Sequence, residues 1–318
     1  MFTLSKSTTE LTYDTDAHKY LGSKLNEIGG RVLLISSLVS EDREKISLIK
    51  KELTTVGVTY IQCNQPFGFV TKDDLEQLQL RAENFNISTV VSVGDTAQRM
   101  SGRFIAQKLA LNYYEIPTQF SNPYLLIPTG IYSNRVVDDF EKIFLAQDLI
   151  TEIIIDKSLM RKMDQDEIKL EAFSILLDLA HFFTSKENNF VSVTESKNLF
   201  LRLLNDIENS TLDLEKLHRY DMTCALYHGA SNDIELSLKV YSWIAGQRFS
   251  IHPNLIAIKL LASLLLIKDE EKLSSRIRKS MDRLSISTRL TDLGLTLSQV
   301  IDITKDNPLN MEVVKKAF

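Results

Sequence analysis

The first half of the chain alternates between short, mainly apolar runs and segments that are apolar on one side only. Four short runs are continuous and rich in β-branched residues, as expected of parallel strands covered on both faces: residues 31–37, 58–63, 88–93 and 113–116. Between them lie three segments with apolar residues at helical spacing, at 42–56, 73–85 and 97–111. Strands that alternate with helices through short connections predict a parallel sheet with right-handed crossovers, which is a Rossmann-like arrangement.

The pattern changes close to residue 156. A last apolar run at 153–155 is followed by long amphipathic or apolar patterns of helical period, at 167–183, 195–207, 231–243, 255–267, 272–284 and 297–304. No unit of about 20–50 residues repeats, which argues against a solenoid. We therefore predict an α/β plus all-α fold. A Rossmann-like domain is expected at residues 1–150 and an α-helical domain at 151–318.

Composition narrows the class of protein. The 318 residues are enough for two packed cores. With 37 basic and 42 acidic side chains the net charge is −5, and no Lys/Arg run marks a nucleic-acid-binding face. The polar N-terminus does not resemble a signal peptide, and the longest apolar stretch, 255–267, is too short for a membrane span. Two cysteines cannot form a disulfide framework, so we expect a cytoplasmic protein without nucleic-acid or membrane partners.

The segment 90–97 (VVSVGDTA) joins a predicted strand to a predicted helix. In open parallel sheets ligands bind beyond the carboxyl ends of the strands, where the first N–H groups of a helix can hold a phosphate. The alternative is a tight turn in which Gly94 merely supplies an unusual backbone angle. The neighbouring carboxylate of Asp95 would repel a phosphate unless it turned away from it.

The stretch from Val90 to Asn122 (VVSVGDTAQRMSGRFIAQKLALNYYEIPTQFSN) resembles the iron-containing alcohol dehydrogenase, glycerol dehydrogenase and dehydroquinate synthase superfamily. There, a strand, Gly-Gly-Gly-Ser/Lys, two residues and Asp-Thr-Ala-Lys precede a helix, a strand and Pro-Thr-Thr. The spacing from Gly94 to Pro117 fits that order without a gap. The run ending at Asp156 is similar to the strand that leads into the family's helical, metal-binding domain. The resemblance implies the same two-domain fold.

The resemblance also implies an NAD or NADP site and a substrate site. Cofactor contacts would fall on four residues: Gly94, Asp95, Thr96 and Thr118. A catalytic, substrate-facing polar position would fall on Asn122 if one residue is missing before it. The match is partial, because the family's triple glycine stands here as Gly-Asp-Thr, the helix acid is Met100 and the helix lysine is Arg103.

A divalent metal such as zinc or iron is implied as well, held by one carboxylate and two histidines. Counting from Asp156 without gaps places Ser174 on the carboxylate position, and Asp178 lies one helical turn further on. Tyr-His-Gly supplies His228 as one histidine, and His218 is the candidate for the other. The alternatives are an acid on an amphipathic helix for Asp178, a surface residue for His218 and a helix-capping residue for His228.

Two hypotheses of different class follow. The first is a metal-dependent alcohol or polyol dehydrogenase, with altered cofactor and metal sites, that passes hydride between a small-molecule substrate and NAD(P). The second is a non-catalytic descendant of that fold, kept as a binding or assembly partner of another protein. A cyclase acting on a sugar phosphate would need a basic cluster that the sequence does not show. Self-association into a homo-oligomer is implied by the resemblance alone.

Overall fold

The computed structural model describes residues 9–37, 42–65, 70–119, 125, 129–134, 139–146, 148–185, 190–229, 238–305 and 308–318. They fall into two compact units, one spanning Lys6–Lys162 and the other containing Met163–Phe318.

The first unit is built on a six-stranded, wholly parallel sheet with the order β1-β8-β5-β4-β2-β3. Its strands are β1 (Glu10–Asp14), β2 (Arg31–Ser37), β3 (Thr59–Gln65), β4 (Thr89–Gly94), β5 (Asn112–Pro117) and β8 (Glu152–Asp156). The predicted parallel sheet is confirmed. The edge strand β1 was not anticipated, because its short sequence ELTYD is mostly polar and only half-buried.

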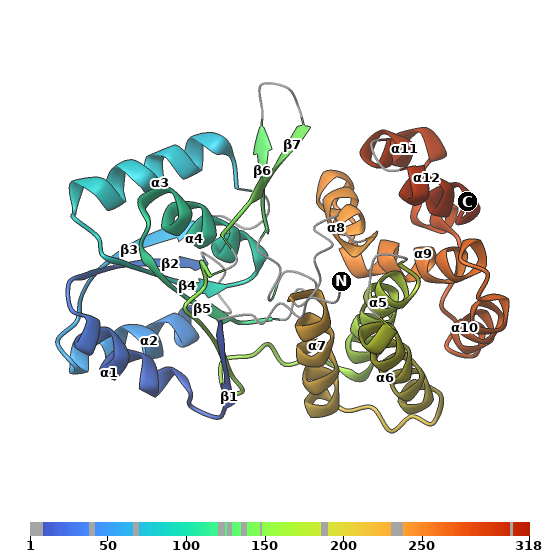
Figure 1. Cartoon of the computed structure of the whole chain (residues 1–318), viewed down its shortest axis with the longest axis horizontal. Coiled ribbons are helices and arrows are strands. Elements are labelled where there is room, and N and C mark those ends of the chain that lie inside the picture. The colour runs from blue at the N-terminus through green and yellow to red at the C-terminus, as the bar shows by residue number, and fades with distance from the viewer. Residues whose placement is uncertain are drawn as a thin grey trace. The chain divides into compact units, whose positions relative to one another are not determined.

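Two pairs of helices cover the two faces of this sheet (Figure 1): α1 (His18–Ile28) with α2 (Arg43–Thr55), and α3 (Lys72–Asn84) with α4 (Thr96–Leu109). Alternate residues of the buried strands point to opposite faces. Val32 and Leu34 of β2 join the core under α1 and α2. On the other face the Tyr113 hydroxyl of β5 donates to the Arg99 carbonyl of α4, at 2.9 Å.

A two-stranded antiparallel sheet follows β5, made of β6 (Thr129–Asn134) and β7 (Asp139–Phe144). It is tied to the start of α3, because the Ser133 N–H donates to the Val70 carbonyl at 2.9 Å. The apolar pattern of the sequence did not indicate this hairpin.

The second unit is helical. In chain order its elements are α5 (Gln165–Phe183), α6 (Phe190–Glu208), α7 (Leu214–Gly229), α8 (Leu238–Phe249), α9 (Pro253–Ile267), α10 (Glu271–Arg283), a 3-10 turn (Leu290–Leu293), α11 (Leu297–Thr304) and α12 (Pro308–Lys316). Helix α5 packs against α6, α7, α8 and α9. The apolar helix α9 lies in the core of this unit, where Leu261 and Leu264 are fully buried. The α/β plus all-α fold is therefore confirmed.

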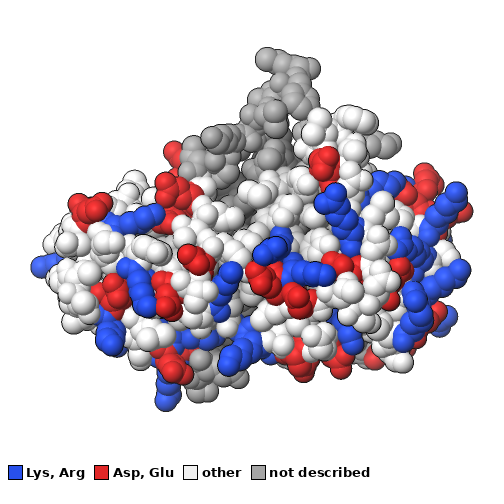
Figure 2. All heavy atoms as spheres, turned by 90° about the horizontal axis from the view of Figure 1, so that it is seen from below, with Lys and Arg blue, Asp and Glu red and all other residues white. Residues whose placement is uncertain are grey.

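The division between the units lies at Lys162 and Met163, twelve residues beyond the expected end of the first domain at residue 150. The reason is that β8 pairs with β5 and β1 and so belongs to the parallel sheet. Within the described segments no helix is both long and apolar enough to cross a bilayer. Figure 2 shows one face of the molecule, on which acidic and basic side chains are interspersed.

Candidate functional site

Four of the five residues expected at a cofactor and substrate site lie together at the carboxyl edge of the sheet. Gly94 ends β4 and is in register with Pro117 at the end of β5. The Thr118 N–H donates to the Gly94 carbonyl at 3.0 Å. Asp95 and Thr96 follow at the start of α4. Asn122 lies outside the described residues.

The amino end of α4 is capped by the chain itself. The Asp95 carboxylate accepts from the Ala97 N–H at 2.9 Å, and the Gln98 side-chain oxygen accepts from the Asp95 N–H at 3.1 Å. This reciprocal arrangement is a capping box, which satisfies N–H groups that a helix start otherwise offers to an anion. The predicted strand, turn and helix are present at this place. The first turn of the helix, however, is already bound to the Asp95 carboxylate.

The space over Gly94 is also filled. Gly94 has a φ of +146°, which favours glycine, and a Cβ added there would stand 2.6 Å from the Gln98 side-chain oxygen. Burial raises the pKa of Asp95, and the hydrogen bond from the Ala97 N–H partly offsets this rise. The Asp95 carboxyl group is the one that faces the helix start. A phosphate group bound at this helix start would be close to the Asp95 carboxylate, which would repel it. The described residues therefore do not fit NAD or NADP in the way that the family resemblance implied.

Behind this edge, a buried cluster of charged side chains joins α4 to β5. The sequence pattern did not indicate this cluster. Glu115 accepts from Arg99 Nε at 2.8 Å and from Arg103 Nε at 2.6 Å, and all three side chains are fully buried. Burial alone would raise the pKa of Glu115, but Arg103 and Arg99 hold it below its ordinary value. Arg103 also donates to the Thr129 carbonyl of β6 at 3.2 Å. Both arginines thus join α4 to β5, and Arg103 also joins α4 to β6.

Asp156 lies at the same carboxyl edge of the sheet, at the end of β8, and several hydrogen bonds converge on its carboxylate. Its carboxylate, at the end of β8, accepts from the His18 backbone N–H at 2.9 Å and lies 2.5 Å from the ring nitrogen Nδ1 of His18. It also accepts from the Ser158 N–H at 2.8 Å and from the Ser158 hydroxyl at 2.6 Å. These contacts fix the turn from β1 into α1 and the exit from β8.

The expected metal site falls in the helical unit, on one face of α5. Glu171, Ser174 and Asp178 are all buried and lie at spacings of three and four residues, which places them on the same face. This face meets a lysine of α8. The Lys239 ammonium of α8 is 3.1 Å from Glu171 Oε1 and 3.8 Å from Asp178 Oδ2.

Two more polar residues complete the surroundings of this lysine. Asn254, near the start of α9, donates to Glu171, and the carboxylate of Asp221 in α7 lies close enough to act on Lys239. Burial alone would lower the pKa of Lys239, but Glu171, Asp178 and Asp221 together raise it well above its ordinary value. The lysine is therefore an ammonium ion at neutral pH.

Both histidines expected as ligands lie on α7. His218 is buried in α7, so its interpretation as a surface residue is wrong. His228 lies near the end of α7, and its side chain is outside the described part of the structure. Among the described residues no group of three or more His, Cys, Asp or Glu side chains could hold a metal ion. With Asp178 paired to an ammonium, the described residues around it do not fit the expected divalent ion.

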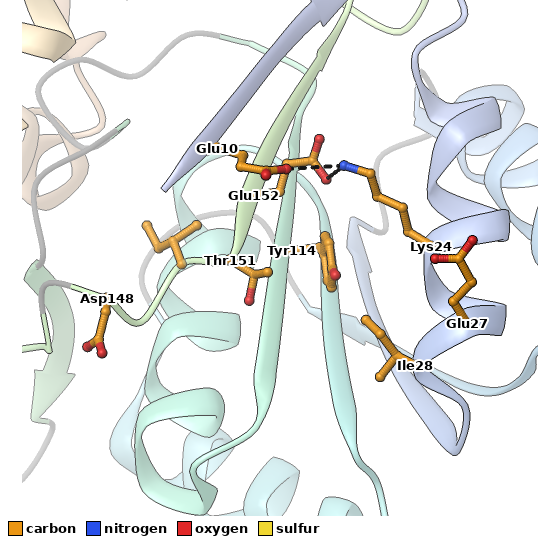
Figure 3. A pocket seen from close by; sticks show the side chains of 9 residues that line it. Glu10, Lys24, Glu27, Ile28, Tyr114, Asp148, Thr151 and Glu152 are labelled. Atoms are coloured by element: carbon orange, nitrogen blue, oxygen red, sulfur yellow. Dashed lines mark hydrogen bonds and ion pairs between the residues drawn. The ribbon is translucent and has the colours of Figure 1, made fainter. Parts of the chain in front are cut away.

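A depression of about 550 Å³ opens at the opposite, amino end of the sheet (Figure 3). Lys24 of α1 reaches across it to Glu152 of β8 at 2.7 Å and to Glu10 of β1 at 3.3 Å. Glu27 and Asp148 add further negative charge to the lining. Ligands of open α/β sheets bind at the carboxyl end of the strands, and this depression lies at the other end.

Comparison with known proteins supports the fold. No protein-family model matches the chain, and neither does any curated protein. Among solved structures, 1,3-propanediol oxidoreductase aligns over 100% of both chains with a TM-score of 0.80 and 14% identity. Iron-containing alcohol dehydrogenase from Thermotoga maritima aligns over 99% of this chain and 98% of its own, with a TM-score of 0.79 and 11% identity. Maleylacetate reductase from Agrobacterium tumefaciens covers 100% and 98%, with a TM-score of 0.76 and 12% identity.

These structures share one architecture with this chain over its whole length. The chain therefore has the fold of the iron-containing alcohol dehydrogenases, as the stretch from Val90 to Asn122 suggested. At 11–14% identity the likeness shows the fold alone, because one fold can carry many different chemistries.

Proposed function

We propose that this chain is a non-catalytic descendant of the metal-dependent dehydrogenase fold, acting as a binding or assembly protein. The observation that carries the proposal is the Asp95 carboxylate bound to the first turn of α4, at the helix start where the family resemblance would put the dinucleotide. The Gln98 side chain supports it, because it lies close to Gly94 and accepts from the Asp95 N–H at the same helix start.

The second candidate is an altered alcohol or polyol dehydrogenase that uses NAD(P) and a divalent metal. It is favoured by the shared fold and by the placement of Gly94 and Thr118 side by side at the carboxyl edge of the sheet. The two candidates differ in one property that can be measured directly, which is affinity for the dinucleotide.

The test follows the melting temperature during titration with NAD+ and NADP+. A ligand present at about 100 times its Kd stabilises a fold by about 2.7 kcal/mol, so even weak specific binding gives a readable shift. We expect no shift for the natural chain. The double variant Asp95→Gly/Thr96→Gly, which restores glycines at the helix start, should gain one. No hydride transfer to NAD(P)+ from a panel of alcohols and polyols is expected.

The matched control is Asp164→Gly, which removes the capping box at the start of α5 without touching the sheet edge. It should lower the melting temperature and leave the response to dinucleotide unchanged. Stabilisation of the natural chain by one NAD(P) per chain, with turnover of any alcohol, would overturn the proposal in favour of the second candidate.

We also propose that the partner is a protein or a second copy of the chain rather than nucleic acid or a membrane. Light scattering on the purified protein tests self-association. Cys63 and Cys224 are buried thiols and not a disulfide, which fits the reducing cytoplasm that we propose as its compartment.

A further inference from the structure

Lys239 is a buried cation held by acids from neighbouring helices. Its side chain is 6% exposed, and those of Glu171 and Asp178 are 6% and 0% exposed. A buried charge is tolerated only when it is paired and hydrogen-bonded. The ammonium meets this condition through its contact of 3.1 Å with Glu171, whose second oxygen accepts from Asn254.

The Lys239 ammonium lies beside a carboxylate that the family resemblance implies as a metal ligand. Asp178 is the carboxylate expected to bind the ion, and it lies 3.8 Å from the Lys239 ammonium. One turn earlier on α5, the Ser174 hydroxyl is buried and makes no hydrogen bond within the described part of the chain. A divalent ion on these side chains would lie within a few ångströms of a fixed positive charge, where Coulomb repulsion is strong.

We propose that the Lys239 ammonium is the resident cation of this acidic cluster and excludes a divalent metal ion from the helical unit. The lysine neutralises part of the charge of Glu171, Asp178 and Asp221 without any exchangeable ligand. The inference concerns α5, α7, α8 and α9 and does not depend on whether α4 binds a dinucleotide. A chain that binds NAD(P) but no metal would contradict only the proposed function.

The first experiment uses the natural chain. The purified protein is incubated with excess Zn²⁺, Mn²⁺ or, without oxygen, Fe²⁺, then desalted and analysed for metal. We expect far less than one metal ion per chain. One metal ion per chain in the natural protein that is lost on Asp178→Asn would overturn the proposal.

The second experiment removes the cation. Lys239→Ala leaves buried carboxylates without their partner, so its melting temperature should fall, and Zn²⁺ or Mn²⁺ should restore it by several degrees while leaving the natural chain unchanged. The double variant Lys239→Ala/Asp178→Asn should lose this response. A Lys239→Ala protein that responds to neither ion would contradict the proposal.

Lys259→Ala is the matched control. Lys259 of α9 is also buried, but its ammonium donates to the Ser287 carbonyl at 2.7 Å instead of to a carboxylate. Its loss should lower the melting temperature without creating a response to metal. If Lys239→Ala is recovered folded only when Zn²⁺ or Mn²⁺ is added during refolding, the proposal is supported. If it does not fold with either ion, the metal content of the natural chain decides the question.

Discussion

At the scale of single residues, charged side chains within apolar runs determine how both units are held together. Glu115 lies within the strand sequence NYYEIP, and Lys239 lies near the start of the largely apolar helix α8. Each finds its counter-charge inside the protein, on Arg99 and Arg103 in one case and on Glu171 and Asp178 in the other. A single charged residue within an apolar run predicts a buried partner of opposite charge. The sequence of the run does not identify that partner.

Asp156 gives a pH-dependent prediction at this scale. Burial alone would raise its pKa, but hydrogen bonds from the His18 backbone, Ser158 and the His18 ring lower it below the ordinary value. A lowered pKa means that the folded chain favours the carboxylate, so the stabilisation is complete above the ordinary aspartate pKa and is lost as the pH falls through the folded-state value. Asp156→Asn should therefore cost about 1.5–3 kcal/mol at neutral pH.

The measurement is urea unfolding of both proteins from pH 7 to pH 3. The difference in unfolding free energy should shrink below about pH 4, where the carboxylate begins to be protonated in the unfolded chain. Asp14→Asn is the control, because Asp14 ends the neighbouring strand β1 but is exposed, and its effect should stay within about 0.5 kcal/mol. A difference between Asp156→Asn and the natural chain that stays constant with pH would refute this assignment.

At the scale of elements, the sequence pattern located most helices and strands to within a few residues. Residues 31–37 were expected as a strand and form β2, and the segments expected at 42–56 and 73–85 form α2 and α3. The helix expected at 231–243 is observed as α8, from Leu238 to Phe249, and residues 230–237 lie outside the described part of the chain. The elements that the pattern missed include the edge strand β1, the β6–β7 pair and helix α1. Their sequences are short or polar, so their conformation depends on pairing and packing with distant residues rather than on local apolar period.

The close approach of α4 to β5 depends on one glycine. A Cβ added at Gly102 would stand 2.5–2.7 Å from the ring and hydroxyl of Tyr113, which is fully buried. We expect Gly102→Ala to destabilise the protein by about 1–3 kcal/mol through overpacking, despite the better helix propensity of alanine. Thermal or urea unfolding would measure the loss.

Gly22→Ala is the matched control in α1. The atoms nearest to an added Cβ there are side-chain atoms of Val56 and Glu52 at 3.1–3.3 Å, which can move aside. Its effect should stay within about 0.5 kcal/mol. Equal stability of the two alanine variants would show that the α4–β5 contact adjusts without cost.

At the scale of the whole molecule, two units each have a separate hydrophobic core. One core lies between the parallel sheet and helices α1 and α2, and the other is centred on α5 and α9. Chains with more than one core depart from two-state unfolding. Calorimetry should therefore give a calorimetric enthalpy larger than the van't Hoff enthalpy, with Gly102→Ala lowering one component of the transition. A single transition with equal enthalpies would contradict this expectation.

The sequence by itself determined the alternation of strands and helices, the change to an all-helical second half and the likeness to one superfamily, because these depend on local apolar period and on the spacing of Gly94 and Pro117. Only the tertiary structure decided what occupies the two candidate sites. Asp95 and Gln98 close the start of α4, and Lys239 pairs with Asp178 from a different helix. The physical reason is that charge pairing depends on distance in space, which local sequence pattern does not specify.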